Sequence, residues 1–62
     1  MHHTDMQADY YLIRLERFNQ GLTQKGLAEK AKISLSAVIK AEHGKSISAT
    51  TNGAIRKALG LK

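Results

Sequence analysis

The sequence of 62 residues contains no cysteine and no proline. Without cysteine, the chain has no disulfide bond and no thiolate metal ligand to support its fold. Without proline, only glycine interrupts its helical patterns. No apolar run is long enough to span a bilayer, and no signal-peptide core follows the amino terminus. We therefore expect a single cytoplasmic domain over residues 1–62, with a small helical core and no membrane contact.

The groups that enzymes use for catalysis are also missing. The chain has no cysteine nucleophile, no phosphate-binding glycine loop and no paired carboxylates, and His43 lies near a helix end without an implied partner. Met1-His2-His3 could chelate copper(II) or nickel(II), but a chain terminus needs no such role to explain it. The sequence predicts no enzyme, no cofactor and no metal site.

The net charge of +5 is unevenly distributed. Up to Gln24 the chain has a net charge of −1, and from Lys25 onward it has a net charge of +6. Such a basic excess is typical of proteins that bind a polyanion, although small soluble domains also carry charge of this size. The positions of the charges have to decide between a nucleic-acid partner and solubility alone.

The periodicity of apolar residues predicts four helices. The first covers residues 4–21, where Thr4 or Asp5 could cap the start and Gly21 could end the helix in the left-handed conformation. Two faces of this helix compete for the core. One face holds Ile13, Arg17 and Gln20, and the other holds Tyr11, Leu15 and Phe18.

The remaining helices are expected at residues 23–31, 34–42 and 49–59, with a loop at residues 45–48. Thr23 and Ser34 are the expected caps of the second and third helices. The last helix could begin as late as residues 51–53, because Asn52-Gly53 favours a turn. No stretch alternates between apolar and polar residues in the way a strand does.

Small residues gather where the second and third helices would cross. Ala28 and Ala31 allow two helices to approach closely, and Ile33 can fill the corner between them. Val38 and Ala41 would pack the third helix against the second. This pattern is typical of a helix-turn-helix, in which one helix rests on the phosphate backbone and the next enters the major groove. A helical hairpin inside a bundle would show the same spacing, so periodicity does not separate the two.

The segment from Ile13 to Gly60 resembles the helix-turn-helix of the lambdoid phage repressor and Cro family, also called Xre-like. The residues that match are Thr23-Gln24, Leu27-Ala28, Ile33-Ser34, Val38, Glu42-x-Gly44-Lys45 and Ala58-Leu59-Gly60. The resemblance implies a compact all-α domain of four or five helices that contains a helix-turn-helix.

The chain departs from the family pattern at three places. Lys32 stands where the family usually has glycine, and a lysine in the left-handed conformation costs about 1 kcal/mol. Gly26 stands where the family has glutamate, and it weakens the second helix by about 1 kcal/mol. The family's fifth helix, often used in dimer contacts, has no counterpart before the last residue, Lys62. We therefore expect a weak homodimer, or a dimer that forms only on DNA.

The resemblance implies that the start of the third helix faces the bases of double-stranded DNA. Leu35, Ser36 and Lys40 occupy the base-reading positions, where leucine contacts a thymine methyl and lysine donates to guanine. Each lysine could instead be an ordinary solvated side chain. The positions that would contact phosphates are Thr23, Gln24, Lys45 and Ser46.

Arg17 and Glu42 match a structural pair of the family, in which an arginine of the first helix binds the glutamate that ends the third. We expect a bidentate ion pair that holds the reading helix against the rest of the domain. The alternative is two independent surface charges, which would contribute little to stability.

These features predict a sequence-specific DNA-binding transcriptional regulator of prokaryotic or phage origin. It would act as a repressor of the Cro/CI type, as a homodimer on a palindromic operator, and would be associated with the nucleoid. Two alternatives stay open. The chain could be a DNA-binding antitoxin that also binds a toxin, or a helix-turn-helix adaptor that binds proteins and has no DNA role.

Overall fold

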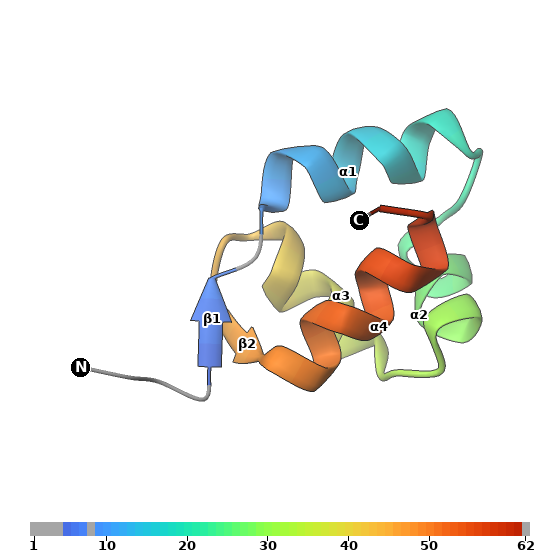
Figure 1. Ribbon diagram of the computed structural model, residues 1–62. Coiled ribbons are helices and arrows are strands. Elements are labelled where there is room, and N and C mark those ends of the chain that lie inside the picture. Colours follow the sequence, from blue (N-terminus) through green and yellow to red (C-terminus); the bar gives the residue numbers. More distant parts are fainter. Residues whose placement is uncertain (1–4, 8, 62) are drawn as a thin grey trace.

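The computed structural model describes residues 5–7, by their backbone, and residues 9–61. The candidate cap Thr4 and the terminal Met1-His2-His3 lie outside the described residues. The elements follow in the order β1 (Asp5–Gln7), α1 (Tyr10–Asn19), α2 (Gln24–Ala31), α3 (Leu35–Glu42), β2 (Ser46–Ser48) and α4 (Ala49–Leu59) (Figure 1). The four helices confirm the expected helical fold class, and none in the described part of the chain could cross a membrane.

The amino-terminal segment differs from the expectation. The first helix does not begin at Thr4 or Asp5 but at Tyr10, and Asp9 caps it by accepting a hydrogen bond from the backbone N–H of Leu12 at 3.3 Å. Residues 5–7 instead form β1. A helical pattern alone could not reveal this, because a three-residue strand is too short to show an alternation.

The two strands pair in an antiparallel arrangement that places Met6 opposite Ile47 (Figure 1). The segment expected as a loop at residues 45–48 is therefore mostly the strand β2. Its burial alternates, with Ile47 buried between two exposed serines. The buried isoleucine holds this segment extended against the core, so its backbone groups find partners in β1.

α4 begins at the earlier of the two expected positions, residue 49, and not at residues 51–53. The helix begins at Ala49, because the Ser48 hydroxyl accepts a hydrogen bond from the backbone N–H of Thr51 at 3.1 Å and caps it. Asn52-Gly53 consequently lies inside the helix. A strong cap has outweighed the turn preference of this dipeptide.

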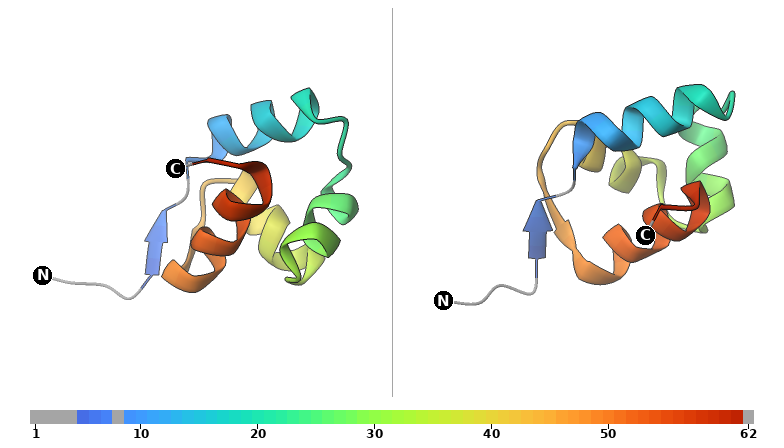
Figure 2. Two further views of the ribbon diagram at one scale, coloured as in Figure 1. Left: turned by 45° about the vertical axis from the view of Figure 1, so that its right-hand side comes forward. Right: turned by 45° about the horizontal axis from the view of Figure 1, so that its top comes forward.

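Four side chains are fully buried and form the centre of the core: Ile13, Leu27, Val38 and Ile55. Each comes from a different helix, so the core joins all four. The small residues Ala28 and Ala41 are buried beside them, which allows α2 and α3 to approach as expected. Figure 2 shows α1 lying across one side of this core, with the other helices all beneath it.

The structure decides which face of α1 is turned inward. Ile13 and Arg17 are buried, whereas Tyr11, Leu15 and Phe18 are exposed. Gln20 is exposed, but its side chain makes a tertiary contact. Its Nε2 donates to the carbonyl oxygen of Leu59 at 2.8 Å and connects the end of α1 to the end of α4. The more apolar of the two competing faces is thus the one left in solvent.

The turn between α2 and α3 depends on a residue in the left-handed conformation. Lys32 has φ 59° and ψ 43°, and it is the one non-glycine residue with positive φ in the described part of the chain. The next residue, Ile33, donates its N–H to the carbonyl oxygen of Ala28 at 3.0 Å and packs its side chain on the core. This arrangement reverses the chain within a few residues, and Ser34 then caps α3.

Replacing Lys32 with glycine is expected to stabilise the protein. Glycine adopts positive φ without steric cost, so Lys32→Gly should raise the free energy of unfolding by about 1 kcal/mol. Urea denaturation at fixed pH measures the change. Lys30→Gly, inside α2, is the control and should lower the free energy of unfolding by about 1 kcal/mol. A loss of stability in Lys32→Gly would contradict the conformational argument.

Candidate nucleic-acid interface

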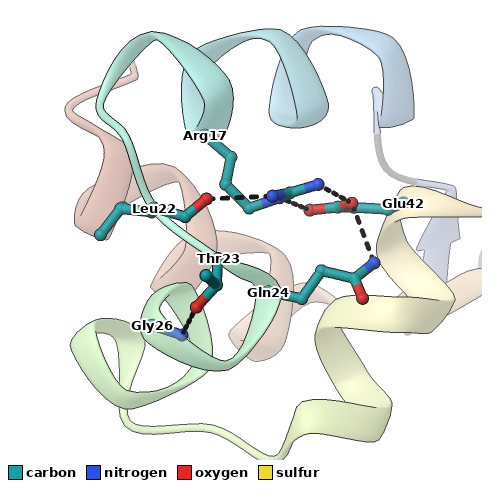
Figure 3. A network of polar contacts seen from close by, with 6 residues as sticks. All are labelled: Arg17, Leu22, Thr23, Gln24, Gly26 and Glu42. Carbon is teal, nitrogen blue, oxygen red and sulfur yellow. Dashed lines mark hydrogen bonds and ion pairs between the residues drawn. The ribbon is translucent and has the colours of Figure 1, made fainter.

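A buried ion pair holds α1 against α3. Arg17 Nε donates to Glu42 Oε2 at 2.6 Å, and Arg17 Nη2 donates to Glu42 Oε1 at 3.0 Å (Figure 3). The side chains are only 11% and 3% exposed. The two parallel hydrogen bonds give the bidentate geometry in which an arginine–carboxylate pair is strongest. The structure therefore brings together the two residues that the resemblance paired.

Two further contacts extend this pair to the start of α2. Arg17 Nη1 donates to the carbonyl oxygen of Leu22 at 3.0 Å, and Gln24 Nε2 donates to Glu42 Oε1 at 3.2 Å (Figure 3). We call Arg17, Leu22, Gln24 and Glu42 the clamp. It fixes α1, the loop after α1, the start of α2 and the end of α3 relative to one another. The axis of α3 is consequently set by hydrogen bonds as well as by packing.

The side of α3 opposite the core is open to solvent. Leu35, Ser36 and Lys40 all lie on it, because the buried side of the helix carries Val38 and Ala41. Ile39 lies between them and is 38% exposed, beside Leu35 at 43%. Ile39 was not among the residues predicted from the sequence to contact bases, because those residues were taken from the positions that match the family. The sequence did contain a sign of its role: Ile39 follows Leu35 by four residues, a spacing that places both apolar side chains on one face of a helix.

A hollow of about 290 Å³ lies beside this face of α3, against β2 and the start of α4. Ser36 and Lys40 line it together with Ser46, so the structure brings these three candidate residues to one place. Further hydroxyl groups come from Ser34, Ser48 and Thr51. The hollow thus offers several hydrogen-bond donors next to one lysine ammonium.

The other candidate residues lie apart from this hollow. Thr23 caps α2, its Oγ1 accepting a hydrogen bond from the N–H of Gly26 at 2.9 Å (Figure 3). Gln24 belongs to the clamp and lines a second hollow, of about 520 Å³, beside α1. Lys45 is exposed just after α3, and its N–H donates to the carbonyl oxygen of Lys40 at 3.0 Å. A backbone hydrogen bond therefore fixes Lys45 relative to the last turn of α3.

The segment that contains α3 carries exposed basic residues and no exposed acid. From Lys32 to Ser48 the chain has three lysines, and its single acidic residue is Glu42. That carboxylate is buried and paired with Arg17, so it does not oppose the exposed lysines. Part of the basic excess of the sequence therefore lies next to α3, where it can attract a polyanion. Among the described residues, no three His, Asp or Glu side chains are placed to hold a metal ion.

Comparison with known proteins agrees with this geometry. A family model described as helix-turn-helix matches residues 13–62, which is most of the chain. The match confirms the resemblance that residues 13–60 indicated. No curated protein matches the chain.

Breaking the clamp is expected to destabilise the fold severely. Arg17→Ala or Glu42→Ala leaves a buried charge without its partner, which costs about 3–5 kcal/mol. The double variant should lose less free energy of unfolding than the sum of the single losses. Urea denaturation of the four proteins measures this cycle, with Glu29→Ala as an exposed carboxylate control that should change stability by at most about 0.5 kcal/mol. Small, additive effects would show that the pair contributes nothing.

Proposed function

The chain belongs to the helix-turn-helix family, whose members are DNA-binding regulators, and on this premise we propose that it binds a specific duplex sequence and regulates transcription by occupying it. The observation that carries the proposal is the exposed side of α3. It combines apolar and donor side chains with two lysines nearby and has no free carboxylate. Occupancy of an operator would block or recruit RNA polymerase.

On this proposal α3 lies in the major groove. Lys40 donates to the O6 and N7 atoms of a guanine, and Ser36 donates to or accepts from a neighbouring base edge. Leu35 and Ile39 form an apolar pair that contacts thymine methyl groups. The support is that all four side chains are exposed on the same side of one helix. The preferred site would accordingly contain a guanine beside one or more thymines.

Phosphate contacts would fix α3 in the groove. Lys45 and Ser46 follow α3 directly and would bind one phosphate, while Thr23 and Gln24 at the start of α2 would bind another. Because the Gln24 side chain already donates to Glu42, its backbone N–H at the helix start is the better phosphate donor. The clamp would then couple phosphate binding at α2 to the orientation of α3.

A homodimer on a palindromic operator, with half-sites about 34 Å apart, would supply the specificity that one short reading helix lacks. Each copy carries a net charge of +5, so two free copies repel one another, and DNA phosphates would remove that repulsion. We therefore expect a monomer or weak dimer in solution that pairs on its operator. Sedimentation velocity measures the state, and a tight dimer at nanomolar concentration without DNA would reject this expectation.

The test of the function is selection of bound sites from random duplex DNA at a low and a moderate salt concentration. A regulator should enrich one sequence at both concentrations, while its total affinity falls as salt rises. Binding that disappears with salt and enriches no sequence would reduce the function to charge attraction. No binding at either concentration would reject a DNA role.

Substitution of Lys40 and of Lys45 should weaken DNA binding in different ways. Lys40→Ala should cost about 1–3 kcal/mol on the selected site and relax the preference at one base pair, because a base contact is lost. Lys45→Ala should weaken selected and scrambled DNA alike and reduce the salt slope by about one per subunit, because a phosphate contact is lost. Fluorescence anisotropy over a salt series measures both.

The control is Lys57→Ala, which removes an exposed lysine from α4 and should change neither base preference nor salt slope by as much. Equal losses on both DNAs for Lys40→Ala would show that this lysine does not read a base.

A further inference from the structure

Every aromatic side chain of the protein is exposed on one helix. The sequence has two tyrosines, one phenylalanine and no tryptophan. They are Tyr10, Tyr11 and Phe18 of α1, and they are 46%, 69% and 67% exposed, while the core is entirely aliphatic. Aromatic side chains normally supply the largest share of buried apolar area in a small domain. Tyr11 and Phe18 share a hollow on this helix, whereas Tyr10 lines a different hollow next to Gln24 and Glu42. The exposed side of α1 that carries Tyr11 and Phe18 is therefore a candidate contact surface.

The exposed residues form a regular stripe, which we call the α1 outer face: Tyr11, Arg14, Leu15 and Phe18. Their spacing of i, i+3, i+4 and i+7 places them on one side of the helix. They line a shallow hollow of about 270 Å³. Figures 1 and 2 show no element covering this side of α1, and the core lies on the other side. The stripe is therefore unpartnered within the described chain.

The stripe has the pattern of a helix that docks into a groove. Amphipathic helices that bind partner proteins in this way use anchors at i, i+3, i+4 and i+7. Tyrosine and arginine are also enriched among the residues that carry most of the energy of protein interfaces. α1 differs from a free peptide because Ile13 and the clamp already hold it in the helical form. Docking would therefore cost little ordering entropy.

Charge identifies the occupant. Arg14 is exposed in the middle of the stripe and has no ion-pair partner among the described residues. The guanidinium of Arg17 also lies 4.7 Å from the ring centroid of Phe18, but Glu42 neutralises its charge, so the positive charge of the stripe comes from Arg14. We propose that the α1 outer face docks into an apolar groove of a partner protein that carries a carboxylate opposite Arg14.

A second copy of the chain fits the stripe less well. A two-fold contact between two α1 helices would place Arg14 on the same flank as Arg14 of its copy, and both copies have a net charge of +5. The four side chains would bury on the order of 400 Å² per copy, roughly half of a standard interface side. A groove in a partner protein would contact both flanks of α1 in addition to the stripe, and it would therefore bury more area than a second α1 helix.

The docking surface is separate from the proposed DNA surface. The stripe lies on the side of α1 opposite Ile13, whereas α3 contacts the inward side of α1 through Arg17. A partner and DNA can accordingly bind at the same time, and the inference does not rest on the proposed DNA function.

The test uses a phage-displayed library of two-helix hairpins whose facing positions are randomised, selected on the full chain. Selected hairpins should carry apolar residues with an aspartate or glutamate at a fixed position. Tyr11→Ser and Leu15→Ser should each weaken binding of a selected hairpin about tenfold or more. Tyr11 is 69% exposed and Leu15 is 43% exposed, so both variants should stay folded at the temperature of the binding assay, which thermal melting checks.

A charge exchange gives the sharpest result. Arg14→Glu should weaken binding of the selected hairpin at least about tenfold. A hairpin whose carboxylate is changed to lysine should bind the Arg14→Glu variant again but should not bind the wild-type chain well. Lys57→Glu makes the same change in net charge on α4 and should leave hairpin binding unchanged.

Three results would overturn the proposal. Hairpins that bind equally to Tyr11→Ser and Leu15→Ser would place the docking surface elsewhere. A selected set without a carboxylate, or one insensitive to Arg14→Glu, would remove the acidic groove. A wild-type dimer that dissociates in Leu15→Ser would make the occupant a second copy. Site selection on DNA is expected to be unchanged in Tyr11→Ser, so failure of the two functions can be distinguished.

Discussion

The arrangement of α1, α2 and α3 depends on one buried guanidinium. Arg17 contacts the Glu42 carboxylate through two hydrogen bonds and the Leu22 carbonyl through a third, so α1, the loop after it and the end of α3 meet at one side chain. A lysine could not replace it, since an ammonium lacks the planar fork that spans both carboxylate oxygens. The pair also cancels the negative charge of Glu42. That cancellation leaves the outside of α3 basic although the helix ends on an acid.

Much of this arrangement is encoded locally and could be predicted. Thr23 and Ser34 cap their helices as expected, and the left-handed Lys32 follows from the tight turn that Ala28 and Ile33 require. The Arg17–Glu42 pair was expected from family resemblance, because nothing in the spacing of two charges in different helices shows that they meet. Local sequence likewise could not predict β1, because its partner strand β2 comes only after three helices.

The orientation of α1 shows why composition misleads. A count of apolar residues favours Tyr11, Leu15 and Phe18 as the buried face, yet these are exposed. The competing face contains Arg17, which is buried only because Glu42 is there to accept its hydrogen bonds. Burial of the polar face is therefore a tertiary effect, and a sequence window over α1 contains no information about it. The aromatic stripe is left outside as a result.

The strand pair has a mechanical consequence. β1 is hydrogen-bonded to the segment that follows α3, so the beginning of the chain is tied to the residues nearest the basic surface. The tie is a short ladder at the sheet edge and should be the first part of the fold to open in local fluctuations. When it opens, β2 loses its backbone partners while the clamp stays closed. Opening of β1 would therefore free the backbone of Ser46 while α3 keeps its orientation, which makes an amino-terminal fusion a poor choice for any measurement on that surface.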